Sequence, residues 1–212
     1  ESGSLIGTDK AWNLGFSGSG QTVAILDTGV DKTHPFLEGK VVSEACYSSN
    51  SGTNLSLCPD GVTSSTAVGS GVPCTGLDGC DHGTHVAGIA AGNGKILKDF
   101  SGVAKDSKII SIQVFSQIDD CGDDPSPCLR TSSTLVILGL ERVLELSGSL
   151  NIAAANLSLG GGDYSSNCDN IIPSYKAAID SLKAVGIATV VASGNDSYKN
   201  AVSRPACISS AV

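Results

Sequence analysis

Four short apolar runs stand out in the pattern of hydrophobic and polar positions along this 212-residue chain, at 21–27, 107–115, 152–159 and 187–193. Each run is rich in Ala, Val, Ile or Leu and is flanked by small or polar residues. Short apolar runs without strict alternation are typical of strands that are buried on both faces of a sheet. We therefore predict four buried parallel strands.

Helical spacing lies between these runs. The apolar residues of 133–146 recur at intervals close to a helical turn, and segment 173–186 begins with Pro173 and ends at Gly186, the usual order of these two residues around a helix. The small residues of 82–91 predict a further helix, packed in the centre of the protein. Strands that alternate with helices predict an α/β fold with a doubly wound, mostly parallel sheet and helices on both faces.

Composition limits the class of protein. Charged residues make up 16% of the chain and hydrophobic residues 41%, which is typical of a globular protein, and the length fits one domain, residues 1–212. The net charge of −8 argues against nucleic acid as a partner. No apolar run reaches the roughly 18 residues that span a bilayer, so we expect no membrane partner. The chain begins at Glu1 rather than Met, and we interpret it as a mature, processed product.

Eight cysteines bear on the compartment. They form no C-x-x-C pair, so a zinc cluster is poorly supported, and we place them in loops rich in Gly, Ser, Pro and Asp. An even number of loop cysteines favours disulfides in a secreted protein. Residues 43–81 show little periodicity, and we interpret them as a long surface excursion, that is, an irregular surface segment crosslinked by such disulfides. The predicted pairs join nearest neighbours: Cys46–Cys58, Cys74–Cys80, Cys121–Cys128 and Cys168–Cys207.

Polar residues follow three of the predicted strands. Asp27, Ser158 and Asn195 come at or just after the ends of apolar runs. In parallel α/β sheets the site lies outside the carboxyl ends of the strands, so we expect these residues at one edge. Two roles stay open for Asp27, namely a cap of the turn into Thr28 and Gly29, or a buried carboxylate that orients an imidazole.

The segment DHGTHVAGIAAG (81–92) holds two of the three histidines, His82 and His85. A His in the first turn of this helix projects towards the carboxyl edge of the sheet, fixed yet reachable, as a general base must be. A structural role for His82 is the alternative. A metal site is disfavoured, because H-x-x-H is not the i, i+4 pair of H-E-x-x-H. We expect His85, one turn further in, to form hydrogen bonds within the core.

Two further segments follow predicted strands. Asn195 in VVASGNDS is either a turn residue or an amide donor aimed at a developing oxyanion. The glycines of NLSLGGG (156–162) leave backbone groups bare, which suits pairing with an extended peptide, and a Gly-rich turn is the alternative. No single motif decides between these interpretations. The order of strand-end Asp, helix-start His, Gly-rich segment and strand-end Asn along one α/β chain is the stronger observation.

In this order the motifs resemble those of the subtilisin-like serine proteases (subtilases, S8 peptidases). VAILDTGVD resembles the family's Asp motif, HGTHVAG its His motif, NLSLGG its substrate-binding segment, and VVASGN the segment that ends in the oxyanion Asn. The similarity runs from GTDKAW near the N-terminus to RPACISSAV at the end. It covers nearly the whole chain.

The resemblance implies a role for each motif. Asp27 would orient His82, and His82, the first His of HGTH, would be the general base and acid. Asn195 would donate a hydrogen bond to the oxyanion. The resemblance also implies two sets of substrate contacts. A backbone edge for the substrate would be formed by Ser158, Leu159 and Gly160. A pocket for the residue before the scissile bond would be lined by Ala192, Ser193 and Gly194.

The chain departs from the family's pattern in two places. The family carries its nucleophile in a G-T-S-M-A motif, and no G-T-S occurs here. We interpret ACISSAV (206–212) as a strand without its continuation, whose exposed edge would leave this chain alone unstable and inactive. Many members bind calcium through an Asp shortly after H-P, where this chain has Phe36. An acidic cluster elsewhere is a solvated loop or, alternatively, a calcium site: Asp119, Asp120, Asp123 and Asp124.

The predicted function is that of a secreted serine endopeptidase that acts on polypeptides. This chain would be its N-terminal two-thirds, and a C-terminal fragment with the catalytic Ser is the expected partner. The chemistry is expected to need no cofactor, and structural calcium stays unlocated. The rival interpretations are a subtilase fold that binds peptides without cutting them and, more distantly, a metal-dependent hydrolase.

Overall fold

The computed structural model describes residues 2–94, 100–122 and 124–212. In these residues a six-stranded sheet forms the centre, in the order β10-β8-β1-β5-β2-β4. The first five strands run parallel, and β4 is antiparallel to β2. The predicted doubly wound, mostly parallel sheet is confirmed. Its strands are β1 (Thr22–Asp27), β2 (Val41–Tyr47), β4 (Ser64–Ser65), β5 (Lys108–Gln113), β8 (Ile152–Leu157) and β10 (Ala188–Val191).

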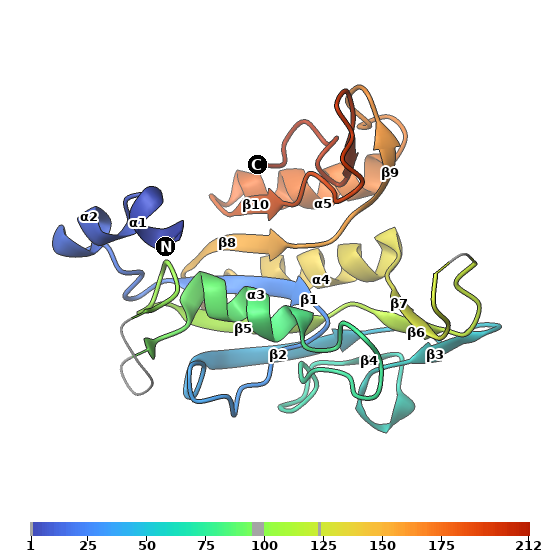
Figure 1. The fold of residues 1–212 in the computed structure, drawn as a ribbon, viewed down its shortest axis with the longest axis horizontal. Helices are drawn as coiled ribbons and strands as arrows, with labels where there is room; N and C mark the ends of the chain where they lie inside the picture. Colours follow the sequence, from blue (N-terminus) through green and yellow to red (C-terminus); the bar gives the residue numbers. More distant parts are fainter. Residues whose placement is uncertain (1, 95–99, 123) are drawn as a thin grey trace.

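Two small antiparallel sheets lie beyond the carboxyl ends of the central strands, on the right of Figure 1. The first consists of β3 (Asn54–Ser56), β6 (Ser116–Ile118) and β7 (Cys128–Arg130). The second pairs β9 (Gly161–Tyr164) with β11 (Val202–Arg204). A short 3-10 helix, η1, covers Pro59–Gly61.

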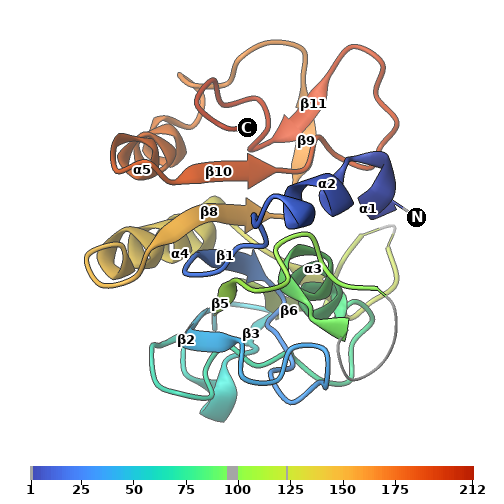
Figure 2. The same cartoon turned by 90° about the vertical axis from the view of Figure 1, so that its left-hand side faces the viewer.

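Helices cover both faces of the central sheet, as Figure 2 shows. On one face lies α3 (His82–Ala91), and on the other lie α4 (Ser133–Leu146) and α5 (Pro173–Ala184). The N-terminal helices α1 (Ser2–Leu5) and α2 (Thr8–Asn13) lie on the side of α3. Among the described residues, the helices are too short or too polar to cross a membrane.

The strand β1 shows why its sequence is apolar throughout. Ala24 and Leu26 belong to the core under α4 and α5, whereas Ile25 belongs to the core under α3. Side chains alternate between the two faces of a strand, so a strand covered on both sides must be apolar at successive positions. On α4, Gly139 allows close approach, because a Cβ there would lie 2.8 Å from the Cδ2 of Leu26.

The four predicted disulfides are all present, so the nearest-neighbour pairing is confirmed. Their placement in loops was partly wrong, because Cys46 lies in β2 without exposed surface. The surface excursion predicted for 43–81 is wrong for residues 43–47 and 64–65, which belong to β2 and β4 of the central sheet, whereas most of the remainder is turns and irregular chain. The strand was missed because the charged Glu44 interrupts its apolar pattern. The charge of Glu44 is compensated by Lys32, whose Nζ lies 2.6 Å from the carboxylate.

The strand predicted for 206–212 is also wrong. This segment forms turns, and the strand of the region is β11, which ends at Arg204. Val212 nevertheless contacts the sheet through its backbone. Its N–H donates to the carbonyl of Thr189 at 2.9 Å, and its carbonyl accepts from Val191 at 3.0 Å.

Candidate active site

Asp27 and His82 meet at the carboxyl edge of the sheet. Asp27 is the last residue of β1 and His82 the first of α3, and Figure 1 shows α3 beginning at the edge where β1 ends. The Nδ1 of His82 lies 2.8 Å from Oδ1 and 3.0 Å from Oδ2 of Asp27. An ionised carboxylate can only accept, so this contact favours the tautomer with the proton on Nδ1. The Nε2 of His82 is then an acceptor.

Gly83 lets α3 approach β1 this closely. A Cβ at this position would lie 2.3 Å from the carbonyl oxygen of Gly29 and 3.1 Å from the Cβ of Asp27. The first distance is far below van der Waals contact, so a larger residue would push the helix away from the strand. The glycine after His82 is therefore part of the geometry of the pair.

Asp27 and His82 differ in exposure. Asp27 has no exposed surface, whereas 47% of the His82 side chain is exposed. Burial raises the pKa of Asp27 above its ordinary value of 3.8, and the hydrogen bonds from His82 and from the N–H of Thr28, at 2.7 Å, act in the opposite direction. A buried carboxylate beside an open imidazole is a suitable arrangement for proton transfer at His82.

Thr28 is a site residue that the sequence did not reveal. Its side chain is buried, its N–H donates to Asp27, and its hydroxyl accepts a hydrogen bond from the N–H of Gly83 at 3.0 Å. Thr28 therefore contacts Asp27 directly and contacts Gly83, the residue that follows His82. Only its place directly after Asp27 signals this in the sequence, because Gly83 is 55 residues away.

The predicted substrate-binding segment follows β8, which neighbours β1 in the sheet. The Oγ of Ser158 accepts a hydrogen bond from the Asn156 side chain at 2.9 Å. The side chain of Leu159 belongs to the core, and Gly160 is exposed. Directly afterwards β9 pairs with β11, so one edge of β9 is occupied by another strand of this chain.

The second predicted substrate-binding segment follows β10. The N–H of Ala192 donates to the carbonyl of Leu157 at 3.1 Å, and the carbonyl of Ser193 accepts from Ser203 at 2.8 Å. Gly194 has a φ of 114°, which favours glycine. Asn195 is exposed. Since β10 lies beside β8 and β8 beside β1, the chain after β10 leaves the sheet at the same edge as Asp27, two strands away.

The core position predicted for His85 is wrong, since 73% of its side chain is exposed. The buried positions of α3 are Gly83, Ala87 and Ala91, spaced by four residues. His85 is two residues from Gly83 and therefore lies on the opposite side of the helix. Its Nε2 lies 3.8 Å from the carboxylate of Asp81. The helix is thus buried along one face only, not in the centre as predicted.

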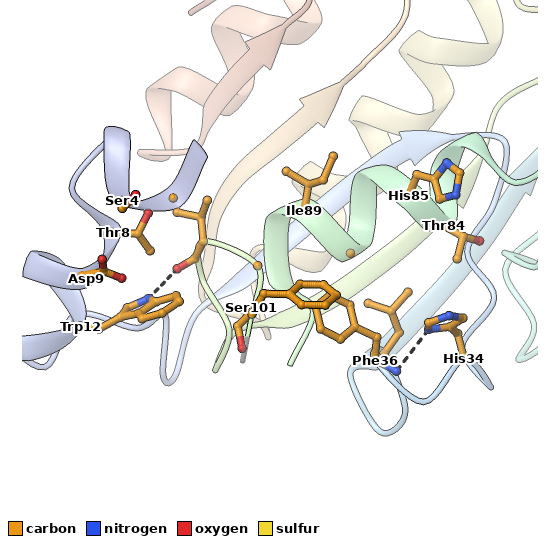
Figure 3. Close-up of a pocket in the computed structure, with 16 residues that line it drawn as sticks. Ser4, Thr8, Asp9, Trp12, His34, Phe36, Thr84, His85, Ile89 and Ser101 are labelled. Carbon is orange, nitrogen blue, oxygen red and sulfur yellow. Dashed lines mark hydrogen bonds between the residues drawn. The ribbon is translucent and has the colours of Figure 1, made fainter. Parts of the chain in front are cut away.

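The outer face of α3 borders a hollow of about 710 Å³. Figure 3 shows His85 and Ile89 on α3, His34 on a neighbouring loop and Trp12 on α2 around this hollow. Neither Asp27 nor His82 lines it. This hollow therefore lies on the far side of the helix, away from Asp27 and His82.

The side chain of Phe36 offers no ligand for calcium. The ring of Phe36 packs against that of Phe100 with 5.3 Å between centroids, and a Cβ on Gly92 would lie only 2.0 Å from it. An aromatic ring offers no oxygen ligand, whereas calcium takes six or more. In the described ranges, no three His, Cys, Asp or Glu side chains are grouped to hold a metal, and Asp123 of the acidic cluster lies outside those ranges.

The chain is similar in sequence to known proteases. Residues 18–212 match the model of the Subtilase family. The minor extracellular protease Vpr of Bacillus subtilis (strain 168) is 30% identical over 92% of this chain and 20% of its own length. Subtilisin Savinase of Lederbergia lenta is 32% identical over 96% of this chain and 58% of its own length.

Solved structures agree with these sequence matches. Sphericase superposes with a TM-score of 0.66 at 24% identity, over 92% of this chain and 53% of the sphericase chain. The chain thus spans less than two-thirds of the length of the relatives it resembles. Because the family model covers nearly all of its residues, this chain belongs to the subtilase family.

Proposed function

We propose that this chain carries the acid–base residues of a serine endopeptidase. The observation that carries the proposal is the contact between the buried Asp27 carboxylate and Nδ1 of His82, which leaves the other nitrogen of a half-exposed imidazole as an acceptor. Membership of the subtilase family gives the reaction class. The substrates would be polypeptides.

His82 moves the protons in this scheme. Its Nε2 takes the proton of a serine hydroxyl while the serine oxygen bonds to the peptide carbonyl carbon, and Asp27 stabilises the imidazolium. The C–N bond then breaks, and His82 gives the proton to the leaving amine. Water repeats the cycle on the acyl-enzyme, so that the serine regains its proton. Side chains make every transfer, and no cofactor is part of the proposal.

The nucleophilic serine is expected outside residues 1–212, because no G-T-S motif occurs in them. In the proposal these residues form the N-terminal part of one peptidase domain, and the serine comes from a C-terminal segment. The coverage of the relatives is compatible with this, since only 58% of the length of subtilisin Savinase aligns with this chain.

The other predicted residues would bind the substrate and the transition state. Asn195 would donate to the oxyanion that forms on the carbonyl oxygen. Ser158 and Gly160 would offer backbone groups to an extended peptide, and Ala192 and Gly194 would line a pocket for the residue before the scissile bond. Their positions after β8, which neighbours β1, and after β10, which neighbours β8, support this assignment.

We also propose that the protein is secreted. Its cysteines pair in four disulfides among the described residues, and disulfides persist in oxidising compartments. The relative Vpr is an extracellular protease by name.

A fluorophosphonate probe tests the enzyme proposal, because it reacts with an activated serine. The natural protein that contains residues 1–212 should be labelled, and its His82→Ala variant should not. A protein with Asp27, His82 and Asn195 intact that is not labelled would contradict the proposal. Peptide binding by that unlabelled protein would instead favour the interpretation as a non-catalytic peptide-binding subtilase.

A further inference from the structure

A short loop closed by the Cys74–Cys80 disulfide leads directly into α3. Its two cysteines are six positions apart, and both are largely buried. The backbone N–H of His82 donates to the carbonyl of Gly79, inside this loop, at 3.1 Å. The loop therefore holds the backbone of His82 directly.

Thr28 joins the same loop to Asp27. Its hydroxyl donates to the carbonyl of Cys80 at 3.1 Å while it accepts from Gly83, and its N–H donates to Asp27. The buried hydroxyl of Thr28 thus links Cys80 to Gly83, and the backbone N–H of the same residue holds the Asp27 carboxylate. In a buried site such bonds do not compete with water, so losing one leaves a polar group without a partner.

The segment before the disulfide packs against the residues after Asp27. The N–H of Val30 donates to the carbonyl of Gly71 at 2.9 Å. A Cβ on Gly29 would lie 2.2 Å from the carbonyl oxygen of Val72, so the two backbones are in direct contact. The chain from 71 to 80 therefore contacts the turn after β1 at several points and fixes its place.

We infer that the Cys74–Cys80 loop and the Thr28 hydroxyl are positioning elements that hold His82 at hydrogen-bond distance from Asp27. Residues 75 and 76 of the loop are exposed, and they have little structure of their own apart from the crosslink. Without the disulfide, the carbonyls of Gly79 and Cys80 lose their fixed place, and with them go the bonds to His82 and Thr28. The kinetic consequence rests on the proposed function, whereas the geometry of the pair does not.

A pair of disulfide variants tests the role of the loop. Cys74→Ser/Cys80→Ser removes the crosslink, and Cys121→Ser/Cys128→Ser is the matched control, because its cysteines are seven positions apart in the β6–β7 region. Loops of similar length contribute similar chain entropy, so both variants should lose similar stability. Only the first should lower kcat, by about 10- to 100-fold with little change in KM, since small misplacements of reacting groups have effects of this size.

A substitution of Thr28 tests the hydroxyl. Thr28→Val keeps the shape but removes both hydroxyl bonds, whereas Thr28→Ser retains them. We expect the valine variant to lose activity to the same extent as the disulfide variant and the serine variant to keep most of it. NMR provides a second measurement. The resonance of the proton on Nδ1 of His82 should shift upfield or broaden in the valine variant, and its chemical shift should stay unchanged in the serine variant.

The NMR signal separates this inference from the proposed function. If the natural protein is not labelled by the serine probe, the Nδ1 proton still reports whether the loop and Thr28 hold the pair. An unchanged Nδ1 signal in Cys74→Ser/Cys80→Ser and in Thr28→Val, both shown to be folded by circular dichroism, would overturn the inference. Equal changes in the control disulfide variant would overturn it as well, because the effect would then be one of general stability. Should both test variants unfold, the Nδ1 signal of wild-type protein under mild reduction of the disulfides decides, and persistence of the signal would overturn the inference.

Discussion

Asp27 and Asn195 belong to the same edge of the sheet but have opposite surroundings. Asp27 has no exposed surface, and its carboxylate accepts hydrogen bonds from Thr28 and His82. Asn195 is exposed and follows a strand two places away. A carboxylate that fixes a tautomer before substrate arrives needs a defined place, which burial and hydrogen bonds provide. In the proposed function the amide of Asn195 meets a charge only during the reaction, so it can stay at the surface until substrate covers it.

We therefore expect substitutions on the two sides to differ in their effects on the proposed reaction and on stability. On the Asp27 side, α3, β1 and the disulfide loop are packed together, so changes there should affect both folding and proton transfer. On the Asn195 side, changes should affect the reaction alone.

Removal of the imidazole should have the largest effect. We expect His82→Ala to lower kcat/KM by roughly 10⁴- to 10⁶-fold, and Asp27→Asn to lower it by about 10⁴-fold through loss of the correct tautomer. Steady-state kinetics with a peptide substrate measures both. A loss of less than tenfold in either variant would show that this pair is not the acid–base centre.

Substitution of Asn195 should have the next largest effect. Asn195→Ala is expected to lower kcat by roughly 10²- to 10³-fold with little change in KM, the usual cost of one oxyanion donor. Because the side chain is exposed, the free energy of unfolding should stay within about 0.5 kcal/mol. The neighbouring Asp196→Ala is the control and should change neither quantity. A clear loss of stability in the Asn195 variant would remove the contrast between the two sides.

The edge of the sheet and its Asp could be predicted because they depend on local pattern. Buried parallel strands are apolar runs, so β1 was recognisable and Asp27 was the polar residue at its end. Segment 133–146 has helical spacing and became α4 with the same bounds. The family motifs added the partner, because HGTHVAG begins at His82. Local patterns and motifs therefore locate the pair within the fold.

Other features depend on contacts between distant segments, which local patterns do not record. Glu44 interrupts β2 with a charge that is explained by two partners outside the strand, Lys32 and the N–H of Gly69. His85 was assigned to the core because its neighbours are small, but the face of α3 that is buried is decided by β1, and it is the face of Gly83. Thr28 reaches Cys80 across 52 positions. In each case the deciding partner comes from another part of the chain.

Gly83 tests the packing on the Asp27 side. We expect Gly83→Ala to lower the free energy of unfolding by about 1–3 kcal/mol, because its Cβ would meet the carbonyl of Gly29 at 2.3 Å and α3 must shift. Gly161→Ala is the matched control, since a Cβ there has no neighbour within 4 Å and its effect should be within about 0.5 kcal/mol. Denaturant unfolding measures both. Equal stabilities would show that α3 yields to the extra methyl group and is not tightly held.

The smallest effect is the pH dependence that the buried charge of Asp27 gives to stability. Burial raises the pKa of Asp27 above 3.8, so the folded state binds this proton more tightly than the unfolded state. The stability that the neutral acid contributes is therefore present below the unfolded pKa and is lost as the pH rises through the folded pKa. Asn carries no charge at any pH, so Asp27→Asn should gain in unfolding free energy relative to wild type as the pH rises from about 3.8. Denaturant unfolding between acid and neutral pH measures this difference, and the same comparison in a His82→Ala background should enlarge it, because the imidazole lowers the pKa of Asp27. A gain for wild type instead would show that the hydrogen bonds from Thr28 and His82 outweigh burial, and Asp27 would then stabilise the fold as an anion.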